Sequence, residues 1–237
     1  MMWMNKAIPL WMMATVLIAP LAAQTSTPPN SLSGKESQQG WKLLFDGRTL
    51  EGWRGFGKDQ VPAAWKVEGG ALAFAAQGEG GDLMTEEEFA DFELHLEWKI
   101  SAGGNSGIFF RVSQDRDWSF QTGAEMQILD NSAHADGGNP KTSSGSNYAL
   151  HAPASDVTRP VGEWNSLRIV ARGDHVEHWM NGVKLLEYQL WDEQWEELVR
   201  NSKFASMPGY GRNKKGHIVL QDHGNKVWYR SIKIRTF

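Results

Sequence analysis

The strongest constraint on the fold is the strict alternation of apolar and polar side chains from Phe92 to Ile100. Every second residue of this segment is a large apolar one, and the residues between them are charged or histidine. A period of two places all the apolar side chains on one face of a β-strand, whereas a helix would scatter them around its axis. The segment therefore predicts a strand with one buried face and one face toward water.

Turn signals separate further strand-like segments along the chain. Gly69-Gly70 and Asn181-Gly182 each lie between two short apolar runs, a spacing typical of β-hairpins. The 25 glycines and 12 tryptophans also favour an all-β protein with tight turns. We expect a two-sheet antiparallel β-sandwich of jelly-roll type, with most tryptophans in its core. The strand at Trp41 is expected to lie beside the last strand, which starts near Val227.

One segment departs from the strand pattern. In WDEQWEELVRNSKF, residues 191–204, the apolar residues recur at helical spacing. Acidic residues occupy its start, where the helix dipole favours negative charge. We therefore expect one short helix near residues 191–204, packed on a sheet.

The N-terminal segment resembles a targeting signal rather than part of the fold. Residues 1–23 carry one lysine, then a largely apolar stretch that ends in small residues, which is typical of a secretory signal peptide. The stretch is short for a membrane span and contains Pro9 and Pro20. Residues 24–39 are rich in Ser, Thr, Pro and Gly and predict a flexible tether, which leaves residues 40–237 as one domain. The expected location is therefore outside the cytoplasm, in the periplasm or the extracellular medium.

Composition and motifs exclude several functional classes. The formal net charge of −4 and a pI near 6.0 provide no bulk attraction to nucleic acid. The chain has no cysteine, so it has no disulfide, no cysteine nucleophile and no lipid-modified cysteine. It also lacks the local signatures of serine hydrolases, zinc proteases and phosphate-binding loops. Any chemistry must come from polar residues that distant segments bring together.

Two segments predict a polar patch. In GGNSGIFFRV, alternation places Gly107 and Arg111 on one strand face, and in AEMQILDN it places Glu125 and Gln127 on one face. If these strands are neighbours, Arg111, Glu125 and Gln127 form one patch in which the guanidinium keeps the carboxylate ionised. The alternative is an ordinary solvent-facing sheet.

Other candidates lie at a strand end and in a long loop. Gln221-Asp222-His223 crowds the end of an apolar strand, just before a Gly-Asn turn. Residues 130–150 form a loop of a length that is usually functional or disordered in a compact β domain. Trp179 shares a strand face with Glu177, an arrangement typical of a sugar-stacking platform. The remaining candidates are Asp130, His134, Asp136 and Tyr148 in the loop, His151 after it, and His178, whose first interpretation is a buried core histidine.

Six segments in order carry a family resemblance. The segments that carry the resemblance are WKLLFDGRTLEGW, GNSGIFFR, EMQILDN, YALHAP, GEWNSLRIVARGDHVEHWMNG and GHIVLQDHGNKVWYRSIKI. Over about residues 40–237, the chain resembles the 3-keto-disaccharide hydrolase family. The resemblance implies a concanavalin-like β-sandwich that is exported and acts on 3-keto-glycosides, as a 1,2-lyase coupled to a hydratase.

Such chemistry needs a defined set of groups. A ketone at C3 acidifies the proton on C2, so a base can remove it and the C1–O bond can then break by elimination. The site needs a base, a donor or cation for the enediolate oxygens, and an acid for the leaving oxygen. The expected roles are Glu125 or His223 as base, Arg111 and Gln127 for the oxyanion or the sugar hydroxyls, His151 or His178 as acid, and Gln221, His178, Asp130, Tyr148 and Trp179 as substrate contacts. A divalent metal ion held by His134, Asp136 or His151 is the alternative electrophile to Arg111.

Two other functions remain open at this point. An ordinary glycoside hydrolase on the same fold needs two carboxylates, for which Glu125 and Glu177 are the nominees. A non-catalytic carbohydrate-binding module needs only the fold and a binding face. In each case the expected partner is a carbohydrate, and the sequence leaves the anomer, the aglycone and the oligomeric state open.

Overall fold

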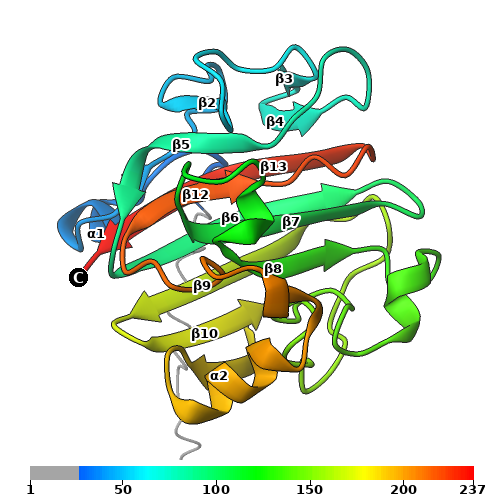
Figure 1. The fold of residues 1–237 in the computed structure, drawn as a ribbon. Helices are drawn as coiled ribbons and strands as arrows, with labels where there is room; N and C mark the ends of the chain where they lie inside the picture. Colours follow the sequence, from blue (N-terminus) through cyan, green and yellow to red (C-terminus); the bar gives the residue numbers. More distant parts are fainter. Residues whose placement is uncertain (1–26) are drawn as a thin grey trace, which may run out of the picture.

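The computed structural model describes residues 27–237, which form two antiparallel β-sheets packed face to face (Figure 1). The predicted all-β sandwich is confirmed, and the predicted signal peptide over residues 1–23 lies outside the described residues. Within the described residues, every helix is too short or too polar to cross a membrane.

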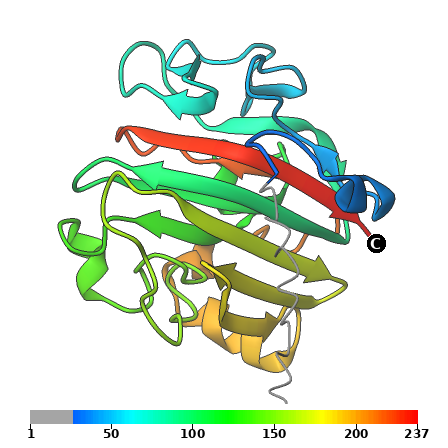
Figure 2. The same ribbon diagram turned by 180° about the vertical axis from the view of Figure 1, so that it is seen from behind.

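The larger sheet has eight strands in the order β11-β10-β9-β6-β13-β4-β3, with β1 also paired to β13 (Figure 2). The expected hairpins β3–β4 and β10–β11 are present, and the first strand pairs with the last, as the sequence predicted. The strands are β1 (Lys42–Leu43), β3 (Trp65–Glu68), β4 (Ala71–Phe74), β6 (Phe92–Ile100), β9 (Asn165–Arg172), β10 (His175–Met180), β11 (Val183–Gln189) and β13 (Val227–Thr236).

The smaller sheet has five strands in the order β2-β5-β12-β7-β8. It faces the viewer in Figure 1, and the eight-stranded sheet faces the viewer in Figure 2. The central strand β12 is far in sequence from both its neighbours, so the site on this sheet combines distant segments. The strands are β2 (Trp53–Gly55), β5 (Leu83–Phe89), β7 (Asn105–Val112), β8 (Ala124–Leu129) and β12 (Gly216–Leu220).

The core lies between the sheets and follows the predicted alternation. The apolar positions of β6 are all buried, and burial of each such side chain contributes about 1.5–3 kcal/mol. The opposite face of β6 is less exposed to solvent than expected, since Glu93 is only 5% exposed. Its carboxylate pairs with Arg168 at 3.1 Å and Arg235 at 2.5 Å on the flanking strands, which offsets the cost of its burial.

The tryptophans are distributed differently from the prediction. Four are buried, Trp53, Trp65, Trp98 and Trp195, and the other six in residues 27–237 are at least partly exposed. The expectation that most would lie in the core is therefore wrong. Several of the six lie on the outer face of the eight-stranded sheet next to cations; Arg230, for example, lies 4.1 Å from the ring of Trp164. An indole that stacks on a guanidinium or ammonium is stable there without full burial.

The predicted helix over residues 191–204 is divided in two. Helix α2 spans Glu193–Arg200, and the carboxylate of Asp192 caps it by accepting from the Trp195 N–H at 2.7 Å. The 3₁₀ helix η3, Lys203–Ser206, follows, and the Ser202 hydroxyl caps it. The other 3₁₀ helices are η1 (Ser119–Gln121) and η2 (Ala135–Gly138). Because the helix ends early, the chain bends and η3 can face the five-stranded sheet.

The tether prediction is wrong for the part of residues 24–39 that the structure describes. Helix α1 spans Gly34–Gln38, with a capping box formed by Ser33 and Glu36. The Asn30 side chain donates to the Gly70 carbonyl at 2.7 Å and accepts from the Ser231 N–H at 2.7 Å. These contacts attach the segment to the sandwich. Composition alone gave no sign of them.

Candidate functional site

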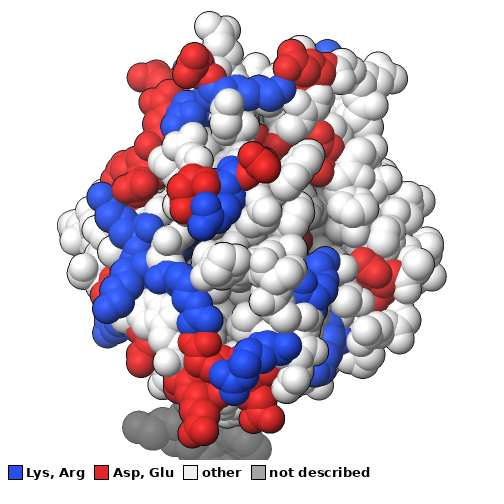
Figure 3. All heavy atoms as spheres, viewed as in Figure 1, with Lys and Arg blue, Asp and Glu red and all other residues white. Residues whose placement is uncertain are grey.

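A cavity of about 210 Å³ lies on the outer side of the five-stranded sheet. Its floor comes from β7, β8 and the end of β12, which are neighbours in that sheet. Figure 3 shows this side of the molecule, where a mostly uncharged area is surrounded by acidic and basic side chains. The lining residues are Asn105, Phe120, Glu125, Gln127, Tyr148, Lys203, Phe204, Gln221 and His223.

Strand register explains why a carboxylate occupies the floor. Alternation along β8 sends Glu125 and Gln127 outward, because Met126 between them is in the core. On the neighbouring strand β7, Gly107 is the register partner of Gln127. A Cβ at Gly107 would overlap the Glu125 carboxylate. The missing side chain therefore provides the space that Glu125 fills.

Replacement Gly107→Ala should displace the Glu125 carboxylate and lower kcat about 10- to 100-fold, since small misplacements of a reacting group are costly. The measurement is steady-state turnover of a 3-keto-glycoside, with circular dichroism to check folding. Gly138→Ala is the matched control, because a Cβ there meets no atom within 4 Å. Equal activity of the two variants would show that Gly107 does not position Glu125.

Burial gives Glu125 unusual proton affinity. The side chain is 5% exposed, and its carboxylate accepts no hydrogen bond from residues 27–237. Burial raises the pKa of Glu125 to about 8, the negative charges of Asp82 and Asp136 add to the rise, and Lys203 opposes it. A carboxyl group with this pKa exchanges its proton near neutral pH and is a stronger base than a surface glutamate.

Two buried amide oxygens also point to a ligand. Asn105 Oδ1 and Gln221 Oε1 have no hydrogen-bond partner among the described residues. The Gln221 backbone is fixed, since its N–H donates to the Gly107 carbonyl at 2.9 Å and its carbonyl accepts from the Ser106 hydroxyl at 2.7 Å. A buried acceptor without a donor costs about 1–3 kcal/mol. A ligand rich in hydroxyl groups would satisfy both oxygens.

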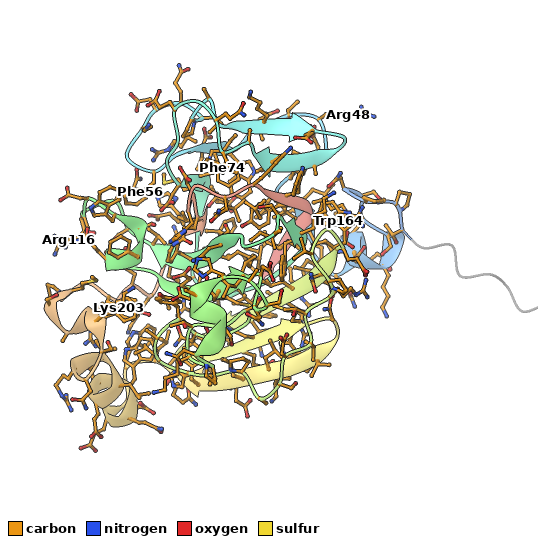
Figure 4. All side chains as sticks on the ribbon, turned by 90° about the vertical axis from the view of Figure 1, so that its right-hand side faces the viewer. Arg48, Phe56, Phe74, Arg116, Trp164 and Lys203 are labelled. Carbon is orange, nitrogen blue, oxygen red and sulfur yellow. The ribbon has the colours of Figure 1, made fainter. Side chains whose placement is uncertain are left out.

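The wall of the cavity comes from the long loop and from η3. The end of the loop pairs with strand β8: the Tyr148 N–H donates to the Glu125 carbonyl at 3.0 Å, and Asn147 forms an antiparallel bridge with Met126. The Tyr148 hydroxyl donates to Asp136 at 3.3 Å. Lys203 Nζ lies 4.5 Å from the centroid of the Tyr148 ring and is the one cationic side chain of fixed charge among the lining residues (Figure 4). Its positive charge acts on the buried carboxyl group of Glu125 and opposes the rise of the pKa that burial causes there.

The three polar residues after β12 have two different roles, one in the turn and one in the cavity. Asp222 accepts from the Gly81 N–H at 2.7 Å and the Gly224 N–H at 2.8 Å, so it fixes the turn after β12. Gln221 and His223, two residues apart, both line the cavity. The exposed His223 ring lies 6.1 Å from the ring of His134. Of the three strand-end residues, Gln221 and His223 therefore line the candidate cavity, whereas Asp222 serves the turn.

Arg111 does not join the patch predicted for it. Its φ of +53° and a register shift between β7 and β12 mark a β-bulge at this point. The bulge shifts the alternation by one residue, so Val112 rather than Arg111 packs with Phe109 on the outer face. Ile108 and Phe110 stay in the core between the sheets, so Val112 does not share their face.

The Arg111 guanidinium is instead used to join loops. It donates to the Ala90 carbonyl at 2.9 Å and the Gly173 carbonyl at 2.8 Å, and it pairs with Asp91 at 3.1 Å. The side chain is 3% exposed and does not line the cavity. Its role is to hold the β5–β6 and β9–β10 turns together.

Replacement Arg111→Met should therefore lower the free energy of unfolding by roughly 3 kcal/mol, since it leaves buried carbonyls without a donor. At 25 °C the folded variant should keep kcat within about twofold of the wild type. Urea unfolding and turnover of the same sample check both statements. A large loss of kcat with unchanged stability would restore Arg111 to the catalytic role.

Two predicted histidines lie elsewhere. His178 is fully buried; its Nδ1 donates to the Gly145 carbonyl at 3.2 Å, and burial lowers its pKa to about 3. It is the core histidine of the first interpretation. His151 stacks on Tyr188 with ring centroids 4.8 Å apart, and burial lowers its pKa to about 4. His151 lines a different cavity with Tyr188 and Trp195, so neither histidine reaches Glu125.

Asp130 and Trp179 are also separate from the cavity. Asp130 accepts from the Gly103 N–H at 2.8 Å and the Ser132 N–H at 3.0 Å, which fixes the turn after β8. Trp179 lies on β10 in the eight-stranded sheet, where its indole N–H donates to Glu177 at 2.7 Å and Arg168 covers its ring at 4.1 Å. The nominated pair of Glu125 and Glu177 is thus divided between two sheets.

Possible metal ligands cluster away from the cavity. In the described part of the chain, one group of three, His175, Glu177 and Glu187, has its donor atoms within 4.8 Å of one another. These residues lie on the β10–β11 hairpin, where Lys184 already neutralises Glu187 at 2.8 Å. The metal set suggested by the sequence, His134, Asp136 and His151, is not brought together, because His151 faces the other cavity.

The cavity contains residues that sequence reasoning missed. Asn105 had a usable signal, since alternation puts it on the same face of β7 as Gly107. Lys203 had no usable signal in the sequence, because residues 191–204 were predicted to form one continuous helix. Only the end of α2 at Arg200 lets the next segment, η3, turn toward the five-stranded sheet. The aromatic lining residues Phe120 and Phe204 were also missed.

Comparison with known proteins places the chain in a family. The model of the 3-keto-alpha-glucoside-1,2-lyase-like domain matches residues 40–235. A 3-keto-disaccharide hydrolase of Bacteroides thetaiotaomicron is 37% identical, over 87% of this chain and 82% of the relative.

Solved structures agree with that assignment. A protein of Parabacteroides distasonis, provisionally described as a glycosyl hydrolase, superposes with a TM-score of 0.82 at 32% identity, over 89% of this chain and all of the other. A Bacillus subtilis protein of galectin-like fold, with a TM-score of 0.52 at 14% identity over 88% of this chain and 94% of the other, shows the shared sandwich architecture alone. The chain belongs to the family of 3-keto-alpha-glucoside-1,2-lyase-like domains.

Proposed function

We propose that the protein is a carbohydrate hydrolase whose substrates are 3-keto-glycosides and which cleaves them by elimination followed by hydration. Glu125 removes the proton from C2, and the resulting enediolate expels the oxygen on C1. The leaving oxygen takes a proton, and a 2-hydroxy-3-keto-glucal remains. Addition of water, with OH to C1 and H to C2, gives the free 3-keto sugar, so the net reaction is hydrolysis.

The lining residues can be matched to these steps. The Lys203 ammonium lines the same cavity as Glu125 and is suited to stabilise the enediolate oxygen. Asn105 Oδ1 and Gln221 Oε1 are buried acceptors for sugar hydroxyls, and Gln127 contributes a further amide. His223 lies at the exposed end and is suited to protonate the leaving oxygen as it departs toward solvent.

One observation supports this proposal most directly: Glu125 is the one carboxylate among the described residues that line the cavity. Ordinary glycosidases use two carboxyl groups that flank the scissile bond. Proton abstraction next to a ketone needs only one base, together with a positive or donating group for the oxyanion. The pKa of Glu125, which burial raises to about 8, suits that base.

The test is incubation of the purified protein with a methyl 3-keto-glucoside in D₂O. We expect deuterium at C2 and release of free 3-keto-glucose. The same assay with the unoxidised glucoside should give no release. Repeating it with a chelator tests the metal alternative, since loss of exchange would make a divalent ion the electrophile. Binding without exchange or release would instead favour a carbohydrate-binding module.

Export is part of the same proposal. A signal peptide over residues 1–23 would place the enzyme in the periplasm or the medium, where glycosides are met before uptake. Sequencing the N-terminus of the protein recovered from those fractions should find a start near Gln24. Recovery of the uncut chain from the cytoplasm would contradict this.

A further inference from the structure

Trp118 is the most exposed large hydrophobic side chain among residues 27–237, at 61%. It lies in the turn between β7 and η1, where its backbone N–H donates to the Gln121 side chain at 2.9 Å. That bond fixes the backbone from which the indole projects. The exposed indole offers a flat apolar face on which the ring of a ligand can stack.

The indole is connected to the cavity by one ring. Trp118 stacks on Phe120, with ring centroids 6.3 Å apart and planes at 15°. Phe120 lines the cavity together with Glu125 and packs on the small outer cluster that contains Phe109 and Val219. The two near-parallel rings, here called the aromatic ladder, therefore lead from the cavity wall at Phe120 to the solvent-exposed Trp118. In Figure 4, the neighbouring Arg116 lies on the same side of the molecule as Lys203.

The size of the cavity indicates what must lie outside it. About 210 Å³ is below the range of about 300–1,000 Å³ that pockets for drug-sized ligands occupy. One hexose ring is an appropriate content, with C2 at the buried Glu125. The group attached at C1 must then lie outside the cavity, and the aromatic ladder connects the cavity, through Phe120 in its wall, to the exposed Trp118 ring.

We propose that Trp118 is the platform for the aglycone, and that it selects leaving groups that present a flat six-membered ring, either a second pyranose or an aryl group. This inference rests on the proposed function. Both kinds of ring offer a flat face to an indole, through C–H bonds in one case and a π-system in the other. Methyl and other small aglycones do not reach the platform and gain nothing from it.

The experiment compares three 3-keto-glucosides, with methyl, glucosyl and 4-nitrophenyl aglycones, in the wild type and in Trp118→Ala. We expect kcat/KM for the two ring aglycones to fall about tenfold in the variant, while the methyl substrate is unchanged. Trp118→Tyr should keep most of the wild-type preference. A loss with the aryl substrate alone would assign the platform to aromatic aglycones, and a loss with both would assign it to rings in general.

Trp164→Ala is the matched control, since Trp164 is a partly exposed tryptophan that lies toward the opposite side of the molecule (Figure 4). It should leave all three values unchanged. An unchanged ratio of ring to methyl substrates in Trp118→Ala would overturn the platform while leaving the proposed function intact. If the wild type releases no keto sugar from any of the three, the proposed function fails and the platform with it. Unchanged turnover of the methyl substrate also shows that Trp118→Ala is folded.

Discussion

Replacement Glu125→Gln is expected to lower kcat for a 3-keto-glucoside about 10³-fold, the middle of the range that a positioned general base contributes. The amide fills the same space beside Gly107 but cannot accept the C2 proton. In D₂O the variant should bind substrate and return it without deuterium at C2. Proton exchange and product release should therefore be lost together.

The same variant should be more stable than the wild type at alkaline pH. The folded pKa of about 8 is above that of an unfolded glutamate, so between about 4.5 and 8 the native state holds more protons than the unfolded state. Wild-type stability therefore falls as pH rises through this window, and an amide at this position removes that contribution. We expect Glu125→Gln to be stabilised by at least about 2 kcal/mol at pH 9, with the difference vanishing near pH 4.

Urea unfolding of both proteins at several pH values measures that difference. The wild-type activity should also rise with pH up to about 8, because the base must be ionised. Glu177→Gln is the matched control, since its carboxylate lies on the other sheet. An active Glu125→Gln, or an inactive Glu177→Gln, would contradict the assignment of the base.

Replacement Lys203→Met should lower kcat about 10²-fold, a typical effect of removing one group that stabilises an oxyanion. The methylene stem remains on the Tyr148 ring, so packing changes little while the charge is lost. Because Lys203 holds down the pKa of Glu125, its removal should also move the activity profile toward higher pH.

The shift of the pH profile separates electrostatic from structural roles for Lys203. A lysine that only packs on Tyr148 would change stability and leave the profile in place. Lys203→Arg keeps the charge and should recover part of kcat without the shift. Lys214→Met is the control, since Lys214 is an exposed lysine near Trp191 and does not line the cavity. Near wild-type kcat and an unmoved profile in Lys203→Met would remove the ammonium from the mechanism.

Where local periodicity dominates, the sequence was a reliable guide. The alternation in β6, the Gly-Gly and Asn-Gly turns and the outward faces of β8 depend only on neighbouring residues. They predicted the sandwich, two hairpins and the outward direction of Glu125 and Gln127. Three further candidates from a strand end and the long loop also line the cavity: Tyr148, Gln221 and His223. Their neighbours Asp130 and Asp222 fix turns instead, so position at a strand end does not by itself distinguish the two uses.

Tertiary structure decided the membership of the site. The pairing of β7 with β12 contains a bulge at Arg111, and this bulge turns the guanidinium away from the predicted patch with Glu125 and Gln127. A helix break brought Lys203 in its place from a distant segment of the chain. Four other candidates have suitable side chains but lie outside the cavity that contains Glu125: His151, His178, Asp130 and Trp179.

The sequence by itself thus determined the fold class, the hairpins and the outward placement of Glu125, the candidate base, since each follows from a short-range pattern of neighbouring residues. The tertiary structure alone decided which cation faces that carboxylate and how strongly burial raises the pKa of Glu125. Both depend on distances between segments far apart in the chain, and desolvation and Coulomb energy are functions of those distances rather than of sequence spacing.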